Sequence, residues 1–252
     1  LGIMMLRVIR VAKEIGIPAV LTTHMTVDHL TQPVFMRPWR PLLSRLIARI
    51  YEKFGEIICV SAEYARQVER FSISSQVHFI SNPIDFDATE IPEANSWDQF
   101  RVFFAGRLNP EKNIGLLLRA FKLLEDKGAN AELWIAGQGA QEKELRQLTE
   151  SLGLTDQVKF LGHVAHNDLP SLYTTCDVFV LPSLVETQGL VALEAMRFRK
   201  PVIVTSRIIS ARELVDDGKN GFIVDAYAPQ ELADRLNRLR NDPQLRRKQG
   251  EA

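Results

Sequence analysis

Short apolar runs alternate with amphipathic segments along this sequence, and this alternation limits the fold more than any other feature. The runs are three or four residues long and rich in Val, Ile, Leu and Phe, which is typical of parallel strands covered on both faces. They lie at residues 19–22, 57–60, 77–80, 102–105, 133–136, 158–161, 178–181, 202–204 and 222–224. Helical periodicity is found between or beside these runs, at residues 2–16, 114–124, 189–198 and 232–239. The pattern predicts an α/β fold with parallel sheets.

The alternation is interrupted between Asp85 and Gln99, where the chain is acidic and polar and contains Pro92. We interpret residues 86–99 as a linker between two domains. Six strand runs follow it in residues 100–252, enough for one complete doubly wound domain. Only three precede it in residues 1–85, so that part is expected to be the remnant of a second such domain.

The ends of the chain are unusual for a complete protein. The sequence starts at Leu1 and opens on a helix that feeds an apolar strand, as if it were cut inside a βα unit. Residues 235–252 are polar and basic, and we expect no packed ending there. We therefore expect a fragment that is truncated at the N-terminus and also at the C-terminus.

Composition excludes several classes of protein. Lys plus Arg and Asp plus Glu both total 31, so the net charge is zero and a nucleic-acid partner is not expected. Cys59 and Cys176 are too few for a disulfide scaffold or a four-thiolate zinc site, and they fit a reducing, cytoplasmic location. No apolar run reaches the roughly 18 residues of a membrane-spanning helix.

Charged residues follow two of the predicted strands, where ligands bind in parallel sheets. Arg107 and Lys112 come after residues 102–105, beside the N-terminus of a helix, which favours anions. The alternative is a solvated loop with an Asn cap.

Glu186 and Glu194 come after residues 178–181, on either side of Gly189, which we expect in the first turn of a helix. They could accept hydrogen bonds from sugar hydroxyls, or they could be acids favoured by the helix dipole. His24 ends the first strand, again at the ligand side of a sheet.

Two further patterns can be interpreted either as functional sites or as ordinary structural features. Gly137 and Gly139 imitate a dinucleotide fingerprint, but its third glycine is missing, so a tight turn is favoured over a nicotinamide site. The segment 36–50 is either an amphipathic membrane-surface helix or a row of core leucines with a solvated basic face, and we favour the second interpretation. Its cations are Arg37, Arg40, Arg45 and Arg49.

Read in order, the runs FFAGRLNPEKNIGLLLRAFKLL, LWIAGQG, VKFLGHV, DVFVLPSLVETQGLVALEAM, KPVIVTS and NGFIVD resemble family 4 of the retaining glycosyltransferases. The upstream runs IPAVLTTH, IICVSAEYA and FISNPID resemble the end of that family's first domain. The resemblance implies a GT-B fold, in which two Rossmann-like domains face each other across a cleft. Residues 1–85 then correspond to the acceptor-side domain and residues 100–252 to the nucleotide-sugar-binding domain.

The resemblance also implies retaining glycosyl transfer from a UDP- or GDP-sugar to a hydroxyl acceptor. It implies catalytic roles for His24, Arg107, Lys112 and Glu186. It implies donor binding by Gly106, Arg107, Lys112, Glu186, Gly189, Leu190 and Glu194. No metal or cofactor is implied, because the two cations stabilise the leaving diphosphate.

Each implied role is specific. Arg107 and Lys112 hold the diphosphate, which also meets the amides near Gly189 and Leu190. Glu194 accepts the ribose hydroxyls. Glu186 contacts the donor sugar, and His24 faces the reacting sugar from the other domain.

The sequence departs from the family pattern in places. Arg199 stands where a small residue is common, and a Gly-Gly pair is missing near Ile209 and Ser210. A non-catalytic nucleotide-sugar-binding fragment therefore remains an alternative. A sugar-nucleotide epimerase on the same fold is another, although the order of Arg107, Lys112, Glu186 and Glu194 resembles the transferases more. We expect residues 1–252 alone to bind nucleoside diphosphates and to transfer sugar slowly or not at all.

The acceptor is only weakly indicated. The TTH segment with the Pro- and Arg-containing stretch after it, together with ETQG, resembles members that form glycolipids. The expected partners are thus a nucleotide-sugar and a sugar, lipid or other hydroxyl acceptor. The expected location is cytoplasmic, with peripheral contact at the inner membrane surface.

Overall fold

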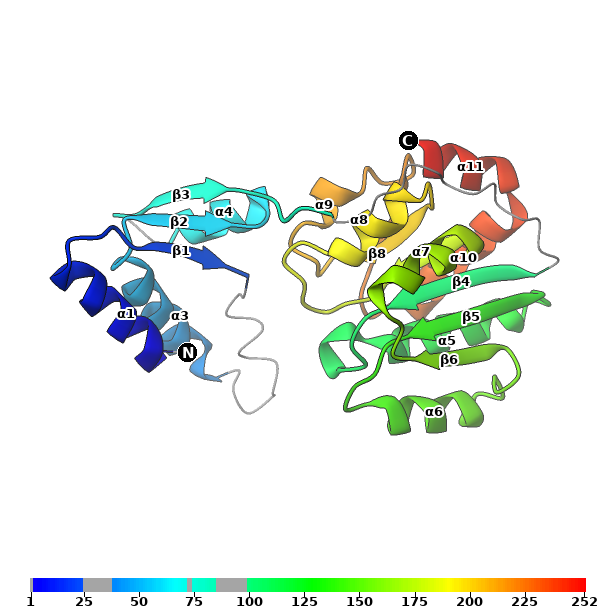
Figure 1. The fold of residues 1–252 in the computed structure, drawn as a ribbon. Helices are drawn as coiled ribbons and strands as arrows, with labels where there is room; N and C mark the ends of the chain where they lie inside the picture. Colours follow the sequence, from blue (N-terminus) through cyan, green and yellow to red (C-terminus); the bar gives the residue numbers. More distant parts are fainter. Residues whose placement is uncertain (1, 25–37, 72–73, 85–98) are drawn as a thin grey trace. The chain divides into compact units, whose positions relative to one another are not determined.

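The computed structural model describes residues 2–24, 38–71, 74–84 and 99–252 (Figure 1). Contacts divide the chain into two compact units, Leu1–Pro83 and Ile84–Ala252. The predicted linker, residues 86–99, lies outside the described residues except for Gln99. The proposed domain boundaries therefore stay a prediction.

The larger unit is built on a six-stranded parallel sheet with the order β6-β5-β4-β7-β8-β9. Its strands are β4 (Phe100–Ala105), β5 (Ala131–Ala136), β6 (Val158–Gly162), β7 (Val178–Leu181), β8 (Val202–Thr205) and β9 (Gly221–Val224). Its α-helices are α5 (Ile114–Glu125), α6 (Glu142–Ser151), α7 (Leu169–Thr175), α8 (Leu190–Arg197), α9 (Ala211–Leu214), α10 (Pro229–Asn241) and α11 (Pro243–Glu251). Two short 3-10 turns are η2 (Pro110–Lys112) and η3 (His166–Asp168). The strand order reverses between β4 and β7, as in a doubly wound fold.

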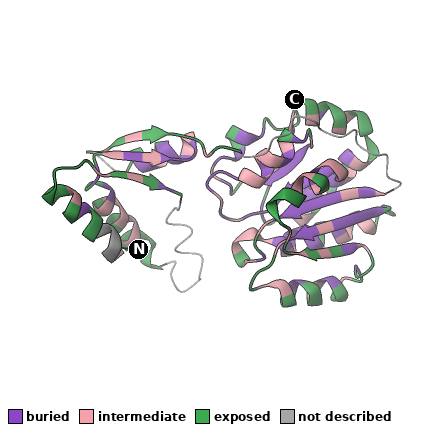
Figure 2. Ribbon diagram, viewed as in Figure 1, coloured by how far each residue is buried: buried purple, intermediate pink, exposed green. Residues whose placement is uncertain are grey.

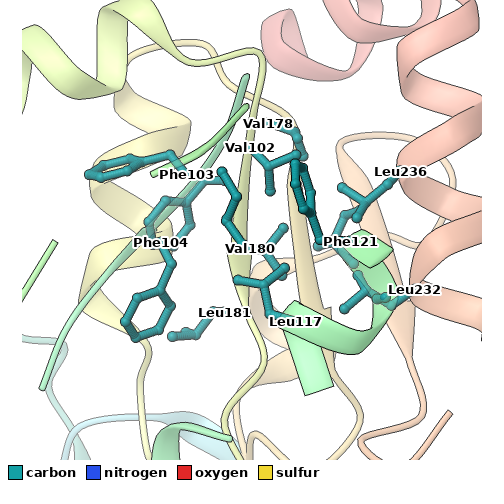
Figure 3. Packing of buried hydrophobic residues seen from close by; sticks show 14 of the residues in the cluster. Val102, Phe103, Phe104, Leu117, Phe121, Val178, Val180, Leu181, Leu232 and Leu236 are labelled. Carbon is teal, nitrogen blue, oxygen red and sulfur yellow. The ribbon is translucent and has the colours of Figure 1, made fainter. Parts of the chain in front are cut away.

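Helices cover both faces of this sheet. Leu117 and Phe121 of α5 lie with Leu232 and Leu236 of α10 on one side of the central strands, next to residues such as Val102 (Figure 3). All five side chains are fully buried. The helical stripes that the sequence predicted in α5 and α10 are therefore the ones that pack, because residues three or four apart share one helix face.

The opposite face of the sheet holds an aromatic cluster. Alternate strand residues point to opposite faces, so Phe103 lies on the side away from Val102. The Phe103 ring meets Tyr173 at 5.4 Å and Phe179 at 5.7 Å between ring centroids, both edge to face. Phe198 stacks on Tyr173 at 5.6 Å. The prediction that the strands are buried on both faces is confirmed for β4 and β7, whereas it is wrong for the edge strand β6, where Lys159 and Leu161 are exposed.

The smaller unit contains a three-stranded parallel sheet with the order β1-β2-β3. Its strands are β1 (Val20–Thr23), β2 (Glu56–Cys59) and β3 (Gln76–Phe79), and its α-helices are α1 (Gly2–Glu14), α3 (Arg40–Tyr51) and α4 (Ala62–Glu69). The central strand is covered, since Ile57 is fully buried, but Val20 and Phe79 on the outer strands are 53% and 51% exposed. Figure 2 shows the buried class mainly on the central strand of this sheet. The strand positions are confirmed, whereas the expected burial of β1 and β3 is wrong. Each of them pairs with only one strand among the described residues.

Helix α3 contradicts the interpretation of residues 36–50 as a row of core leucines. Leu42 and Leu46 are 56% and 52% exposed, and Arg45 is exposed as well. Tyr51 at the end of the helix is buried. Arg45 and Leu46 follow Leu42 by three and four positions, so each of them shares an outer face of the helix with Leu42. Arg37 lies outside the described residues.

The C-terminal residues differ from the expectation of an unpacked ending. Helices α10 and α11 both pack on the larger unit. The Arg246 guanidinium lies 3.4 Å from Asp177 and over the ring of Phe100, and Gln249 is 2% exposed and donates to the carbonyl of Gly218. Basic side chains there cover apolar surface with their stems, which a count of polar residues does not reveal. In the described part of the chain, no helix combines the length and the apolar character needed to span a membrane.

Candidate functional site

Two loops meet where the strand order reverses, at the carboxyl ends of β4 and β7. The amide of Leu184, after β7, donates to the carbonyl of Glu111, after β4, at 2.8 Å. Beside this contact, the Lys112 ammonium donates to the Glu186 carboxylate. The two side chains are 14% and 20% exposed, so the ion pair is largely screened from water. Two of the predicted site residues, 74 positions apart, are thus brought together.

The backbone before α5 holds Lys112 in this position. Residues Pro110–Lys112 form the turn η2, and Asn113 then takes a left-handed conformation with φ 52°. Asn tolerates that conformation better than other residues with a side chain. The side-chain Nδ2 of Asn113 also donates to the carbonyl of Ala226, after β9, at 2.9 Å. Lys112 is therefore carried on a turn that is anchored on both sides.

The two glycines after β5 let another loop approach the loop after β4. A Cβ atom on Gly137 would lie 1.8 Å from the carbonyl oxygen of Gly106, and one on Gly139 would lie 2.5 Å from that of Leu108. Leu108 also exchanges backbone hydrogen bonds with this loop, donating to the carbonyl of Gln138 and accepting from Gln141. The glycines thus have a steric role. This agrees with the tight turn that the sequence analysis favoured over a nicotinamide site.

The sequence predicts Gly189 in the first turn of a helix, but the residue lies just before α8. It is the N-cap residue with φ 74°, and Leu190 begins the helix. Any other residue at this position would have a strained backbone, and its Cβ atom would lie 3.1 Å from Leu214 and 3.2 Å from Leu181. The first amides of α8 have no acceptor within the helix, as at any helix start, so they can donate to an anion.

Glu194 lies one turn further into α8 and is partly buried. Its Oε2 accepts a hydrogen bond of 2.7 Å from the hydroxyl of Tyr173. Burial and the neighbouring Glu194 charge both raise the pKa of Tyr173, so its hydroxyl stays protonated. Glu194 is therefore held against the body of the unit and is not turned away into solvent.

The remaining predicted residues are placed less firmly. The Arg107 side chain is 75% exposed and lies 3.7 Å from Glu111. Gly106 has φ 154°, and a Cβ atom on it would lie 3.9 Å from the Lys112 side chain. His24 is exposed at the end of β1, in the smaller unit. Its role toward a donor in the larger unit stays a prediction.

Sequence reasoning missed the residues that support the loop after β7. The amide of Ile209 donates to the carbonyl of Glu186 at 3.0 Å, and the Ser210 hydroxyl donates to that of Gln188 at 2.8 Å. Thr205 donates in the same way to the carbonyl of Ser183. Tyr173 was missed as well, because it belongs to the apolar pattern of the core and nothing local marks its hydroxyl.

No group of three or more His, Cys, Asp or Glu side chains suited to holding a metal ion occurs in the ranges that the structure describes.

The parallel sheet with its site at the reversal of strand order, and the second parallel sheet in the smaller unit, define a protein of the GT-B fold. The crystal structure of Anabaena Alr3699/HepE in complex with UDP-glucose is similar, with a TM-score of 0.81 and 25% identity. The match covers 98% of this chain and 69% of that one.

Comparison with family models identifies the protein family of each part of the chain. The model described as Glycosyl transferases group 1 matches residues 87–252, and the model described as Glycosyltransferase Family 4 matches residues 1–88. The chain belongs to the group 1 family of glycosyl transferases. The predicted GT-B fold and glycosyltransferase family are thereby confirmed.

Curated relatives are similar over part of their length. Alpha-D-kanosaminyltransferase of Streptomyces kanamyceticus is 33% identical over 150 residues, which are 60% of this chain and 39% of the relative. D-inositol 3-phosphate glycosyltransferase of Corynebacterium jeikeium is 37% identical over 157 residues, 60% of this chain and 37% of the relative. The matched part of the chain thus spans less than half the length of these relatives.

Proposed function

We propose that residues 100–252 are the donor-binding part of an enzyme that transfers a sugar from a nucleotide-sugar to a hydroxyl acceptor, with retention of anomeric configuration. The observation that carries the proposal is the Lys112–Glu186 pair, which lies at the reversal of strand order between β4 and β7. In open parallel sheets this is the place where ligands bind. Family membership supports the class of reaction.

The chemistry explains why a fixed cation is needed there. Breaking the bond between sugar and diphosphate leaves an anionic nucleoside diphosphate and a sugar with positive character. A fixed donor aimed at the developing charge contributes about 3–4 kcal/mol to transition-state stabilisation. Lys112, held on an anchored turn, fills this role in the proposal, and the more exposed Arg107 adds a second charge. No metal is invoked, because these cations take its place.

The carboxylates have separate roles in the proposal. Glu186, beside Lys112, faces the donor sugar and contacts its hydroxyls. Glu194, held by Tyr173, accepts the hydroxyls of the ribose. The amides at the start of α8, from Leu190 onward, donate to the diphosphate.

For the donor we propose a UDP- or GDP-sugar. The Anabaena protein that this chain resembles was solved with UDP-glucose, which supports UDP first. For the acceptor we propose a hydroxyl of a sugar or of a glycolipid precursor, with His24 near the reacting sugar.

Peripheral contact with the inner membrane surface is also part of the proposal. Exposed Leu42 and Leu46 next to Arg45 on α3 support it, since apolar and basic side chains on one helix face suit an anionic lipid surface. Sedimentation with anionic vesicles tests it, and we expect Leu42→Gln/Leu46→Gln to release the chain. Binding that is unchanged in this variant contradicts the membrane contact.

Calorimetry of the 252-residue chain with UDP and GDP tests the donor site directly. We expect binding of at least one nucleotide, weakened about 10- to 100-fold in Lys112→Ala, because a charge-assisted hydrogen bond contributes about 1.5–3 kcal/mol. Lys143→Ala is the matched control, since Lys143 is exposed on α6. Binding of neither nucleotide, or equal binding by the wild type and Lys112→Ala, contradicts the proposal.

Kinetics test the roles in a form of the protein that transfers sugar. Lys112→Ala and Arg107→Ala should each lower kcat/KM about 10²- to 10³-fold. Glu194→Gln should mainly raise KM, because the ribose is bound equally in the ground and transition states. Glu186→Gln should mainly lower kcat, because its contact strengthens as charge develops on the sugar. Changes below about threefold at both cations would exclude the diphosphate assignment.

A further inference from the structure

We propose that Tyr173 is a positioning residue, whose hydroxyl orients the Glu194 carboxylate toward the ribose hydroxyls of the nucleotide. The inference rests on the proposed function and deepens it. It names a residue that touches no substrate and that acts through the residue it holds.

The tyrosine ring is fixed in place from several sides. Tyr173 is fully buried, with Phe103 edge to face at 5.4 Å and Phe179 at 5.7 Å. Phe198 stacks on it nearly parallel, at an interplanar angle of 10°. A ring enclosed in this way has little freedom, since interiors are close-packed. Its hydroxyl oxygen therefore has one defined position.

The hydroxyl donates toward Glu194. The distance from Tyr173 Oη to Glu194 Oε2 is 2.7 Å, whereas the carbonyl oxygen of Val191 lies at 3.4 Å. Hydrogen bonds to an ionised acceptor are shorter and stronger than neutral ones. The carboxylate is consequently the main partner, and the core aromatic cluster fixes the orientation of a charged side chain at its edge.

The carboxylate keeps capacity for a ligand. An ionised Glu offers about four acceptor positions on two oxygens, and the tyrosine occupies one on Oε2. Two neighbouring hydroxyls, as on a ribose, can be accepted by the remaining positions. A glutamate on α8 without this bond would sample several rotamers, and ordering it on binding would lower the affinity.

Tyr173→Phe removes the hydroxyl and keeps the ring. We expect the affinity of the chain for UDP to fall about 3- to 10-fold, the usual range for one hydrogen bond. The affinity for 2′,3′-dideoxy-UDP should stay unchanged, because that ligand offers Glu194 no hydroxyl. Tyr227→Phe is the control, since Tyr227 is 68% exposed. Thermal unfolding shows whether each variant is folded.

A double-mutant cycle separates this inference from the proposed function. Glu194→Ala should bind UDP and 2′,3′-dideoxy-UDP equally, and Tyr173→Phe should have no further effect in that background. Unchanged UDP affinity in Tyr173→Phe, or equal losses for both nucleotides, overturns the positioning role alone. If Glu194→Ala still prefers UDP as strongly as the wild type does, the ribose assignment fails, and the positioning role fails with it.

Discussion

The two sheets of this chain are built from the same kind of strand and differ in what covers them. In the larger unit, Val102, Phe103 and Phe179 are fully buried between helices. In the smaller unit, only the central strand is covered to that degree, and Val20 and Phe79 remain about half exposed. The same apolar pattern thus forms strands in both units, whereas burial depends on the layers and neighbouring strands around them.

The polar groups at the strand ends differ in the same way. At the end of β1, the Thr23 hydroxyl lies 2.9 Å from that of Tyr51 and 3.0 Å from that of Tyr64, a buried neutral cluster. At the ends of β4 and β7 the partners are charged, Lys112 and Glu186. Neutral hydroxyls satisfy each other at modest cost, whereas the Lys112–Glu186 pair places charge at the edge where ligands bind in parallel sheets. The comparison favours the larger unit as the place of donor chemistry.

The largest expected effect tests the difference in covering. Phe103→Ala should destabilise the larger unit by about 3–5 kcal/mol, because it leaves a cavity in the aromatic cluster. Phe79→Ala in the smaller unit should cost less than about 1 kcal/mol, since about half of that side chain is already in water. Urea unfolding followed by circular dichroism measures both. Similar losses would mean that the two sheets are equally well packed.

The second prediction compares two glycines. Gly137→Ala should cost about 2–5 kcal/mol, because φ is 132° and the new Cβ would meet the carbonyl oxygen of Gly106 at 1.8 Å. Gly55→Ala in the smaller unit finds nothing within 4 Å and should change stability by about 0.5 kcal/mol or less. Thermal melts of the two variants provide the comparison. A tolerated Gly137→Ala would contradict the close packing of the loops after β4 and β5.

The third prediction concerns pH. Burial opposes ionisation of Glu132, but hydrogen bonds from Lys159 and Trp134 outweigh it, so the pKa of Glu132 is lowered in the folded state. A lowered folded pKa gives stability that is fully present above the ordinary value of 4.5 and is lost as the pH falls through the lowered one. Glu132→Gln should lower stability by about 1–3 kcal/mol at neutral pH and flatten this acid dependence.

The control for that prediction lies in the smaller unit. Glu56 pairs with His78, but the two side chains are 43% and 47% exposed. Exposed pairs contribute about 1 kcal/mol or less, so Glu56→Gln should have a small effect at neutral pH. Urea unfolding at several pH values measures both variants. An equal acid dependence in wild type and Glu132→Gln would show that the Glu132 network does not stabilise the fold.

The smallest expected effect concerns two residues in the left-handed conformation. Arg199 in the larger unit has φ 56° and is exposed, whereas the smaller unit has Gly16 at φ 71°. Arg199→Gly should stabilise the protein by about 1 kcal/mol or less, since the relief of backbone strain in the folded state outweighs the added entropy of the unfolded chain. Gly16→Ala should destabilise it by about 1 kcal/mol. Thermal melts that show a loss for Arg199→Gly would indicate that its side chain has a structural role.

Local pattern was sufficient for the strands but not for their burial. All nine strand runs appear within a residue or two of their predicted positions, and the stripe of α5 packs as its spacing indicated. The exposed Leu42 and Leu46, and the packed Gln249, were not predicted. Spacing tells which residues share a face of a helix, but it does not tell whether another layer covers that face.

The sequence by itself determined the strands, the loops that carry the charged residues, and the resemblance to a glycosyltransferase family. Tertiary structure alone decided that Lys112 meets Glu186 and that Tyr173 holds Glu194, across 74 and 21 positions of the chain. The physical reason is the order of the sheet. Strands β4 and β7 become neighbours only because the chain reverses its direction of winding after β6, and no local periodicity records that reversal.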